Sequence, residues 1–244
     1  MDRKLNELVS RLKEAAGKNL ESVVLYGSAA TGSYRAGSSD LNVLCTLVTM
    51  DVHELQLLAP VVLWWTREEK EPPPLFFLAE ELARSTDVFA IESLDVKRAH
   101  RVLFGPDPIA ALDVPMNLHR VQVERDLRML LLRLRQHALL SGKNESEYVA
   151  VLKKASSSAL TLLRHTLLAF GEEPPSDSGR LFARIGELSG ANASAFQALH
   201  DYHEGANLKL DPFEAYDDYI HALEKVIAAL DKLVPKKEWQ RVAR

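Results

Sequence analysis

The sequence has little of what defines several common protein classes. Its 244 residues include a single cysteine, Cys45, so neither a disulfide framework nor a cysteine-based zinc site can be built from it. The longest apolar stretch, residues 55–65, is too short to cross a membrane, and residues 1–13 lack the uninterrupted apolar segment of a secretion signal. We therefore expect a cytoplasmic protein with no membrane partner.

The sequence also lacks an excess of one charge sign. The formal net charge is -4 at pH 7, and basic and acidic residues are interspersed. This balance argues against nucleic acid as a partner, because non-specific nucleic-acid binding relies on a positive field. With 47% hydrophobic and 26% charged residues, the chain has the composition of an ordinary globular protein of one large domain or two small ones.

The first 114 residues have the periodicities of an α/β (α+β) domain. Apolar residues at spacings of three and four predict an N-terminal amphipathic helix that ends at 17–19. The residues on its apolar face are Leu5, Leu8, Val9 and Leu12. Short apolar runs between turn residues predict four strands, at 22–26, 40–48, 75–78 and 88–94. Further helices are predicted at 53–68, where Pro60 predicts a kink or a late start, and at 80–85, with a short helical turn at 29–32.

The composition changes near residue 115, and no strand pattern follows. Leu- and Arg-rich segments of helical period predict helices at 117–140, 146–170, 179–188, 193–203 and 212–233. Glu124 and Asp126 lie near several arginines of the first of these, which favours ion pairs on a solvated helix face. We therefore expect an α/β domain over 1–114 followed by an all-α helical bundle over 115–244.

Polar residues lie at the end of one predicted strand and at the start of the next. The strand at 22–26 ends at Gly27-Ser28, and the next strand begins with Asp40, followed two residues later by Asn42. Residues two apart on a strand point to one face, so Asp40 and Asn42 are expected to project together toward the Gly27-Ser28 turn. Glycine allows a polyphosphate to approach the backbone, the serine and backbone amides donate to its oxygens, and a carboxylate binds Mg²⁺. The pattern predicts a phosphate site beside a metal site.

The residues 25–28 (Leu-Tyr-Gly-Ser) and 39–44 (Ser-Asp-Leu-Asn-Val-Leu) resemble the signature of the DNA polymerase beta-like nucleotidyltransferase superfamily. The similarity is greatest to its minimal and kanamycin nucleotidyltransferase-like members. In that family an apolar residue and Gly-Ser precede Asp-apolar-Asp or Glu, and a third acid lies on a later strand. The resemblance implies a small mixed sheet with flanking helices, and often an appended helical bundle that helps to bind the acceptor. It also implies Mg²⁺-dependent transfer of a nucleoside monophosphate from a nucleoside triphosphate.

By position, Gly27 and Ser28 match the family's phosphate-binding turn, and Asp40 matches its first metal-binding acid. Asn42 stands where the family has a second acid. An amide oxygen can still bind Mg²⁺, but because it is uncharged it neutralises less of the charge of the metal ion than a carboxylate does.

The third acid has three candidates. Glu92 is an ionisable group within the apolar run 88–94, where a charge is costly unless it is paired or bound to metal. Asp87 and Asp95 flank the same run and compete for the role. We favour Glu92, which gives Asp40, Asn42 and Glu92 as the predicted catalytic and metal-binding set.

Two functions are compatible with these residues. The first is an Mg²⁺-dependent nucleotidyltransferase acting on a small-molecule or protein acceptor. The second, suggested by Asn42, is a catalytically degenerate module that binds a nucleotide or a protein partner and forms homo-oligomers or other complexes through its helical half.

Overall fold

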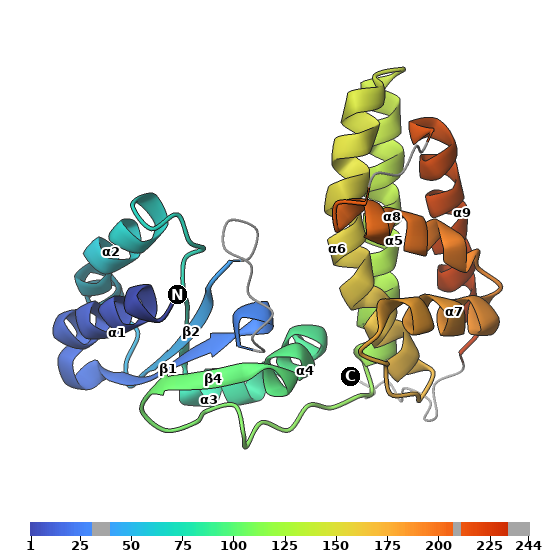
Figure 1. The fold of residues 1–244 in the computed structure, drawn as a ribbon. Helices are drawn as coiled ribbons and strands as arrows, with labels where there is room; N and C mark the ends of the chain where they lie inside the picture. Colours follow the sequence, from blue (N-terminus) through green and yellow to red (C-terminus); the bar gives the residue numbers. More distant parts are fainter. Residues whose placement is uncertain (31–39, 207–210, 234–244) are drawn as a thin grey trace, which may run out of the picture. The chain divides into compact units, whose positions relative to one another are not determined.

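The computed structural model describes residues 1–30, 40–206 and 211–233. The chain divides into two compact units, Met1–Met116 and Asn117–Arg244. All strands of the described chain belong to the first unit, and the described part of the second is built from helices and loops (Figure 1). The fold class is therefore the predicted one, a small mixed sheet with helices followed by a helical region.

The sheet of the first unit has the strand order β3-β2-β1-β4. Its strands are β1 (Leu20–Tyr26), β2 (Asn42–Leu47), β3 (Leu75–Leu78) and β4 (His100–Phe104). β1 is antiparallel to both of its neighbours, and β3 is parallel to β2. Tyr26, the last residue of β1, is paired with Asn42 on one side and with His100 on the other. The first residues of β2 and β4 thus flank the end of β1.

Helices cover both faces of this sheet (Figure 1). They are α1 (Asp2–Ala16), α2 (Val52–Arg67), α3 (Ala79–Arg84) and α4 (Ala90–Arg98), with the 3-10 turns η1 (Gly17–Asn19) and η2 (Gly27–Ala29). Apolar side chains of α1 and α2 form one core with the sheet. Leu82 of α3 and Val96 of α4 belong to a second core that includes Val24 and Leu44. The first unit is therefore a three-layer structure.

Alternate residues of β2 enter the two cores. Leu41, Val43, Cys45 and Leu47 lie in the core with α1 and α2, whereas Leu44 lies in the core with α3 and α4. Because side chains alternate along a strand, Asn42 is on the α3 and α4 face. Burial raises the pKa of the Cys45 thiol to about 12, so this cysteine is a neutral core residue.

Helices α1 and α2 agree with the sequence pattern. α1 buries Leu5, Leu8 and Leu12 as predicted. α2 begins after Asp51, whose carboxylate accepts a hydrogen bond from the backbone N–H of Glu54 at 2.9 Å. Pro60 lies inside this helix, so the alternative of a late start is wrong. Of the helical turn predicted at 29–32, residues 31 and 32 lie outside the described part of the chain, and η2 begins earlier, at Gly27.

The strand predicted at 88–94 is wrong, because this segment turns and then forms α4. The carbonyl of Ser85 accepts hydrogen bonds from the N–H groups of Val88 and Phe89, at 3.1 and 2.9 Å, and Phe89 in turn accepts from Ser93 at 2.8 Å. Val88 and Phe89 are 58% and 47% exposed, so the apolar run does not mark a buried strand. A run of this length does not distinguish a strand from a helix, and Glu92 consequently lies on a helix.

The fourth strand of the sheet is instead β4, which begins twelve residues after the predicted one. It lies outside all four of the predicted strands. Its sequence has two polar residues followed by Val102, Leu103 and Phe104, so there is no alternation of polar and apolar residues that could have identified the strand.

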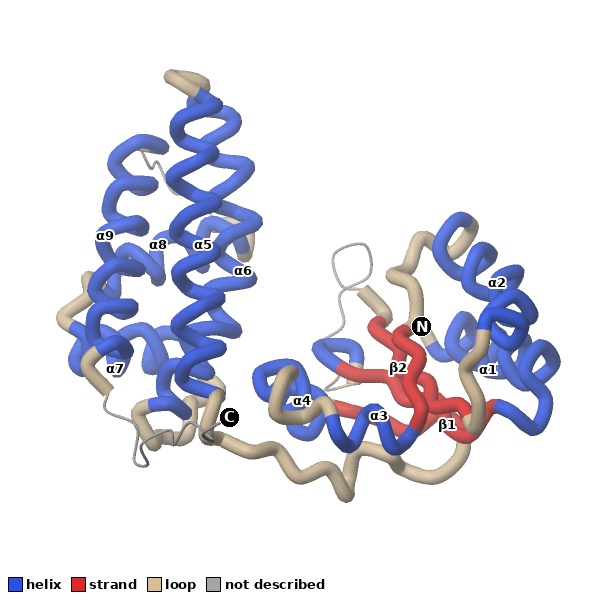
Figure 2. Tube along the Cα trace, turned by 180° about the vertical axis from the view of Figure 1, so that it is seen from behind, coloured by secondary structure: helices blue, strands red, loops and turns tan. Residues whose placement is uncertain are grey.

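The second unit contains α5 (His119–Ser141), α6 (Glu145–Ala169), α7 (Ser178–Ser189), α8 (Ala193–His203) and α9 (Pro212–Asp231). The long helices α5, α6 and α9 pack side by side (Figure 2). Tyr216 of α9 donates a hydrogen bond to the Leu134 carbonyl of α5 at 2.7 Å, and Tyr219 donates to Ala155 of α6 at 3.2 Å. No helix in the described part of the chain has an apolar stretch long enough to cross a membrane.

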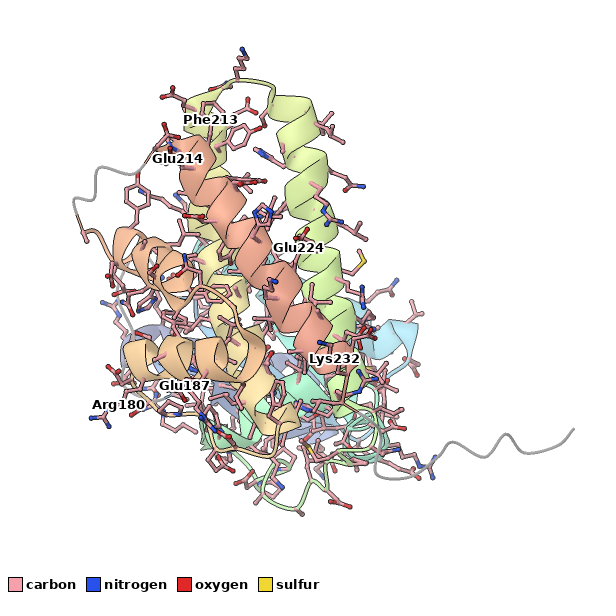
Figure 3. All side chains as sticks on the ribbon, turned by 90° about the vertical axis from the view of Figure 1, so that its right-hand side faces the viewer. Arg180, Glu187, Phe213, Glu214, Glu224 and Lys232 are labelled. Atoms are coloured by element: carbon pink, nitrogen blue, oxygen red, sulfur yellow. The ribbon has the colours of Figure 1, made fainter. Side chains whose placement is uncertain are left out.

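Side-chain contacts also join α9 to α6 and stabilise α5. Phe213, at the start of α9, packs edge-on against Tyr148 of α6 with 4.9 Å between ring centres (Figure 3). On α5, Glu124 accepts hydrogen bonds from Arg120 and Arg128 at 2.6 and 2.8 Å. The predicted ion pairs of this helix are therefore confirmed for Glu124, and Asp126 likewise pairs with its neighbouring arginine.

Candidate functional site

The candidate site begins at Gly27, where β1 ends. Gly27 has a φ of 79°, in the left-handed region that side chains disfavour. Its N–H donates to the Ala99 carbonyl at 3.0 Å, and its own carbonyl accepts from Ala30 at 3.0 Å. Both hydrogen bonds fix the backbone of the turn, and the exposed residue Ser28 follows within it. The local fold therefore requires glycine at this position and leaves the turn accessible.

Asn42 lies directly beside this turn. It is the cross-strand partner of Tyr26, and a Cβ atom built on Gly27 would lie 3.5 Å from Nδ2 of Asn42. The side chain is partly exposed. The structure thus brings Gly27 and Asn42 together, and an amide group faces the point where a ligand would approach the glycine backbone.

Asp40 immediately precedes β2 and is exposed. The next residue is held by a side chain, because the Leu41 N–H donates to Oε2 of Glu71 at 3.0 Å. Glu71 is nearly buried, and its Oε1 lies 3.3 Å from Nζ of Lys4. Hydrogen bonds from Lys4 to Glu69 and Glu71 raise the pKa of the Lys4 ammonium despite the opposing effect of burial. This ion-pair network fixes the chain between Asp40 and Asn42.

A row of three polar side chains crosses the sheet at the end of β1. His100 and Asn42 are the partners of Tyr26 on its two sides, and directly paired residues share a face of the sheet. The His100 ring is held at both nitrogens, with Nδ1 3.0 Å from the Val96 carbonyl and Nε2 3.1 Å from the Asp107 carboxylate. The sequence reasoning did not identify His100, because its strand was not recognised.

Glu92 lies near this row although it is on α4. Burial raises the pKa of the Tyr26 hydroxyl, and the negative charge of Glu92 raises it further. Because Tyr26 and Asn42 share a face of the sheet, a Glu92 charge that acts on Tyr26 lies near that face. Of the competing acids, Asp87 precedes α4 and Asp95 lies on it, about one turn after Glu92. The structure leaves the choice among the three as a prediction.

The donor set can be compared with what Mg²⁺ requires. Neither β3 nor β4 carries a carboxylate, so the third acid on a later strand that the resemblance implies is not on these strands. In the described residues no group of three His, Cys, Asp or Glu side chains is arranged to hold a metal ion. The Asp40 carboxylate and the Asn42 amide fit a single Mg²⁺ that arrives with a triphosphate, because Mg²⁺ commonly takes one or two protein oxygens and completes its shell with phosphates and water.

A second pair of chemically active groups lies in the helical unit. His119 of α5 and His165 of α6 are buried, and Nε2 of the first lies 2.9 Å from Nδ1 of the second. A hydrogen bond between two imidazoles joins the two helices. The contact belongs to the interior of the helical unit.

Comparison with known proteins finds the fold but no close relative. No protein-family model and no curated protein matches the sequence. A solved structure, spectinomycin adenyltransferase AAD(9) from Enterococcus faecialis with ATP and spectinomycin, is similar with a TM-score of 0.58. The match covers 95% of this chain and 100% of that chain at 13% sequence identity. The chain therefore has the fold of a nucleotidyltransferase followed by a helical region, and at this identity the likeness concerns the fold alone.

Proposed function

We propose that the protein binds a nucleoside triphosphate at the Gly27 turn and is an Mg²⁺-dependent nucleotidyltransferase that acts on a hydroxyl of a small-molecule or protein acceptor. One observation carries the proposal: on a nucleotidyltransferase fold, a glycine with positive φ ends β1 beside Asn42, and Asp40 precedes the same strand. The reaction would join the acceptor oxygen to the α-phosphorus and release pyrophosphate.

The residues of the chain have separate roles in this proposal. Gly27 lets phosphate oxygens approach the backbone, and Ser28 offers them a hydroxyl. Asp40 and Asn42 hold Mg²⁺, which neutralises charge on the phosphates when it is bound. Glu92 accepts the proton that the acceptor hydroxyl loses. The helical unit binds the acceptor.

The donor set also favours a second candidate function. Asn42 replaces an acid, and β3 and β4 carry none, so the site has fewer carboxylates than the resemblance implies. The alternative is a protein that binds a nucleotide without transferring it and uses its helical unit for contacts with itself or another protein.

Binding and transfer separate these functions. We would measure the thermal unfolding midpoint with each of the four ribonucleoside triphosphates and Mg²⁺, starting with ATP, which the similar adenyltransferase contains. Transfer of label from α-labelled ATP would then be measured with spectinomycin as the first acceptor and with other hydroxyl-rich small molecules and proteins. Label transfer that is lost in Asp40→Ala supports the enzyme, and binding without transfer supports the alternative. No stabilisation by any triphosphate would contradict both nucleotide-based proposals.

A further inference from the structure

The amide of Asn42 differs from a carboxylate in what it offers to a phosphate. Nδ2 is the Asn42 atom that faces the Gly27 turn, 3.5 Å from the position that a Cβ would take there. This nitrogen carries two hydrogen-bond donors, whereas an ionised aspartate at the same position only accepts. A phosphate oxygen placed over Gly27 would therefore meet a donor at residue 42.

The strands of the sheet also bring fewer carboxylates to the turn than the resemblance implies. Asp40 is exposed and β3 and β4 carry no carboxylate, while Glu92 lies on α4 and not on a strand of the sheet. A cluster of carboxylates repels a triphosphate unless a metal ion lies between them, since like charges a few ångströms apart in a partly buried site interact strongly. With an amide in place of one acid, much of that repulsion is absent.

We propose that this site binds the phosphates of its nucleotide without requiring Mg²⁺, with the Asn42 amide donating to a phosphate oxygen above Gly27. The inference rests on the proposed function, because it concerns the same nucleotide site. Mg²⁺ is then needed for transfer and adds little to affinity. With Asn42 in place of an acid, the site holds the phosphates through a hydrogen-bond donor of the protein and not through a metal ion.

The test is a calorimetric titration of the full chain with ATP, once with EDTA and once with excess MgCl₂ at matched ionic strength. For the unaltered protein we expect dissociation constants that agree within about threefold between the two conditions. In Asn42→Asp, a charge replaces a donor, and metal-free affinity should fall by roughly 10- to 100-fold and recover when Mg²⁺ is added. Asn42→Ala, which removes the donor and adds no charge, should lose affinity about equally in both conditions.

Gln56→Glu is the matched control, because it adds the same charge at an exposed position of α2, which packs on the opposite face of the sheet. It should bind ATP as the unaltered protein does. Unfolding midpoints of all variants show whether a change in affinity reflects a loss of folded protein.

The outcomes distinguish this inference from the proposed function. ATP binding that requires Mg²⁺ would overturn the inference and leave nucleotide binding intact, and so would equal metal-free affinity of folded Asn42→Asp and the unaltered protein. Absence of ATP binding in both conditions, together with no stabilisation by the other triphosphates, would overturn the inference and the proposed function together.

Discussion

Gly27 combines a backbone requirement with a proposed role in phosphate binding. Its φ of 79° disfavours any side chain, and a Cβ at this position would be in ordinary contact with Asn42. We expect Gly27→Ala to cost about 1–2 kcal/mol of folding free energy, the typical strain of a left-handed conformation. It should weaken ATP binding by at least about tenfold, because the methyl group occupies the approach to the backbone.

Gly190→Ala is the matched control for this change. Gly190 has a φ of 71° at the end of α7, and nothing lies within 4 Å of a Cβ built on it. The control carries similar strain in the other unit and should leave ATP affinity unchanged. Chemical denaturation and calorimetry measure the two effects, and equal loss of affinity in both variants would show that strain alone explains the result.

Asp107 predicts a sensitivity to acid. Burial opposes its ionisation, but hydrogen bonds from His100 and from the N–H groups of Ile109 and Ala110 prevail, and the pKa of Asp107 lies below its ordinary value. Because the folded protein has the lower pKa, Asp107 stabilises the fold above the unfolded pKa of about 4, and this contribution is lost as pH falls through the lower, folded value.

The variant Asp107→Asn tests this expectation. It keeps an oxygen acceptor for Ile109 but loses the charge, so we expect a loss of about 1 kcal/mol at pH 7. The difference in unfolding free energy between variant and unaltered protein should shrink as the pH is lowered below about 4. Denaturant titrations over this pH range measure the difference in unfolding free energy. A difference that does not change with pH would contradict the role of the Asp107 charge.

At the scale of elements, the end of β4 is a tightly constrained turn. Gly105 has a φ of 76°, and a Cβ built on it would lie 1.9 Å from the backbone oxygen of Glu21 in β1. The two backbones can stay this close only with glycine, so Gly105→Ala forces the strands apart. We expect a loss of about 3 kcal/mol or more, since strain and a backbone clash act together.

Gly17→Ala, in the same unit, provides the comparison. Gly17 has a φ of 54° with open space around its Cβ position, so this variant carries strain without the clash. It should lose about 1 kcal/mol in the same denaturant titration. Similar losses in the two variants would mean that the sheet adjusts easily at Gly105.

The elements also show what local pattern could and could not predict. The long helices follow from periodicity, because each buries one face over many residues. β1 and β2 follow instead from short apolar runs, because both faces of these strands are buried. The segment 88–94 was misread because four apolar residues in a row fit a strand or a helix, and only the hydrogen bonds to Ser85 decide between them. The proximity of Gly27 and Asn42 followed from strand alternation, whereas the position of Glu92 beside Tyr26 depends on how α4 packs.

At the scale of the whole molecule, the buried residues of the sheet form cores that lie within the first unit. The two core clusters of this unit contain only residues between Leu5 and Leu112. We propose that the chain has two domains and that residues 1–116 fold alone, because a layer on each face of the sheet is complete without the helical unit.

This proposal gives the last prediction. A fragment of residues 1–116 should unfold cooperatively and bind ATP with an affinity within about threefold of the full chain, since the residues of the proposed nucleotide site all lie in it. It should fail to transfer label, because the helical unit is the proposed acceptor site. Circular dichroism, calorimetry and the label-transfer assay test these three properties. A folded fragment that binds no ATP while the full chain does would place part of the nucleotide site in the helical unit.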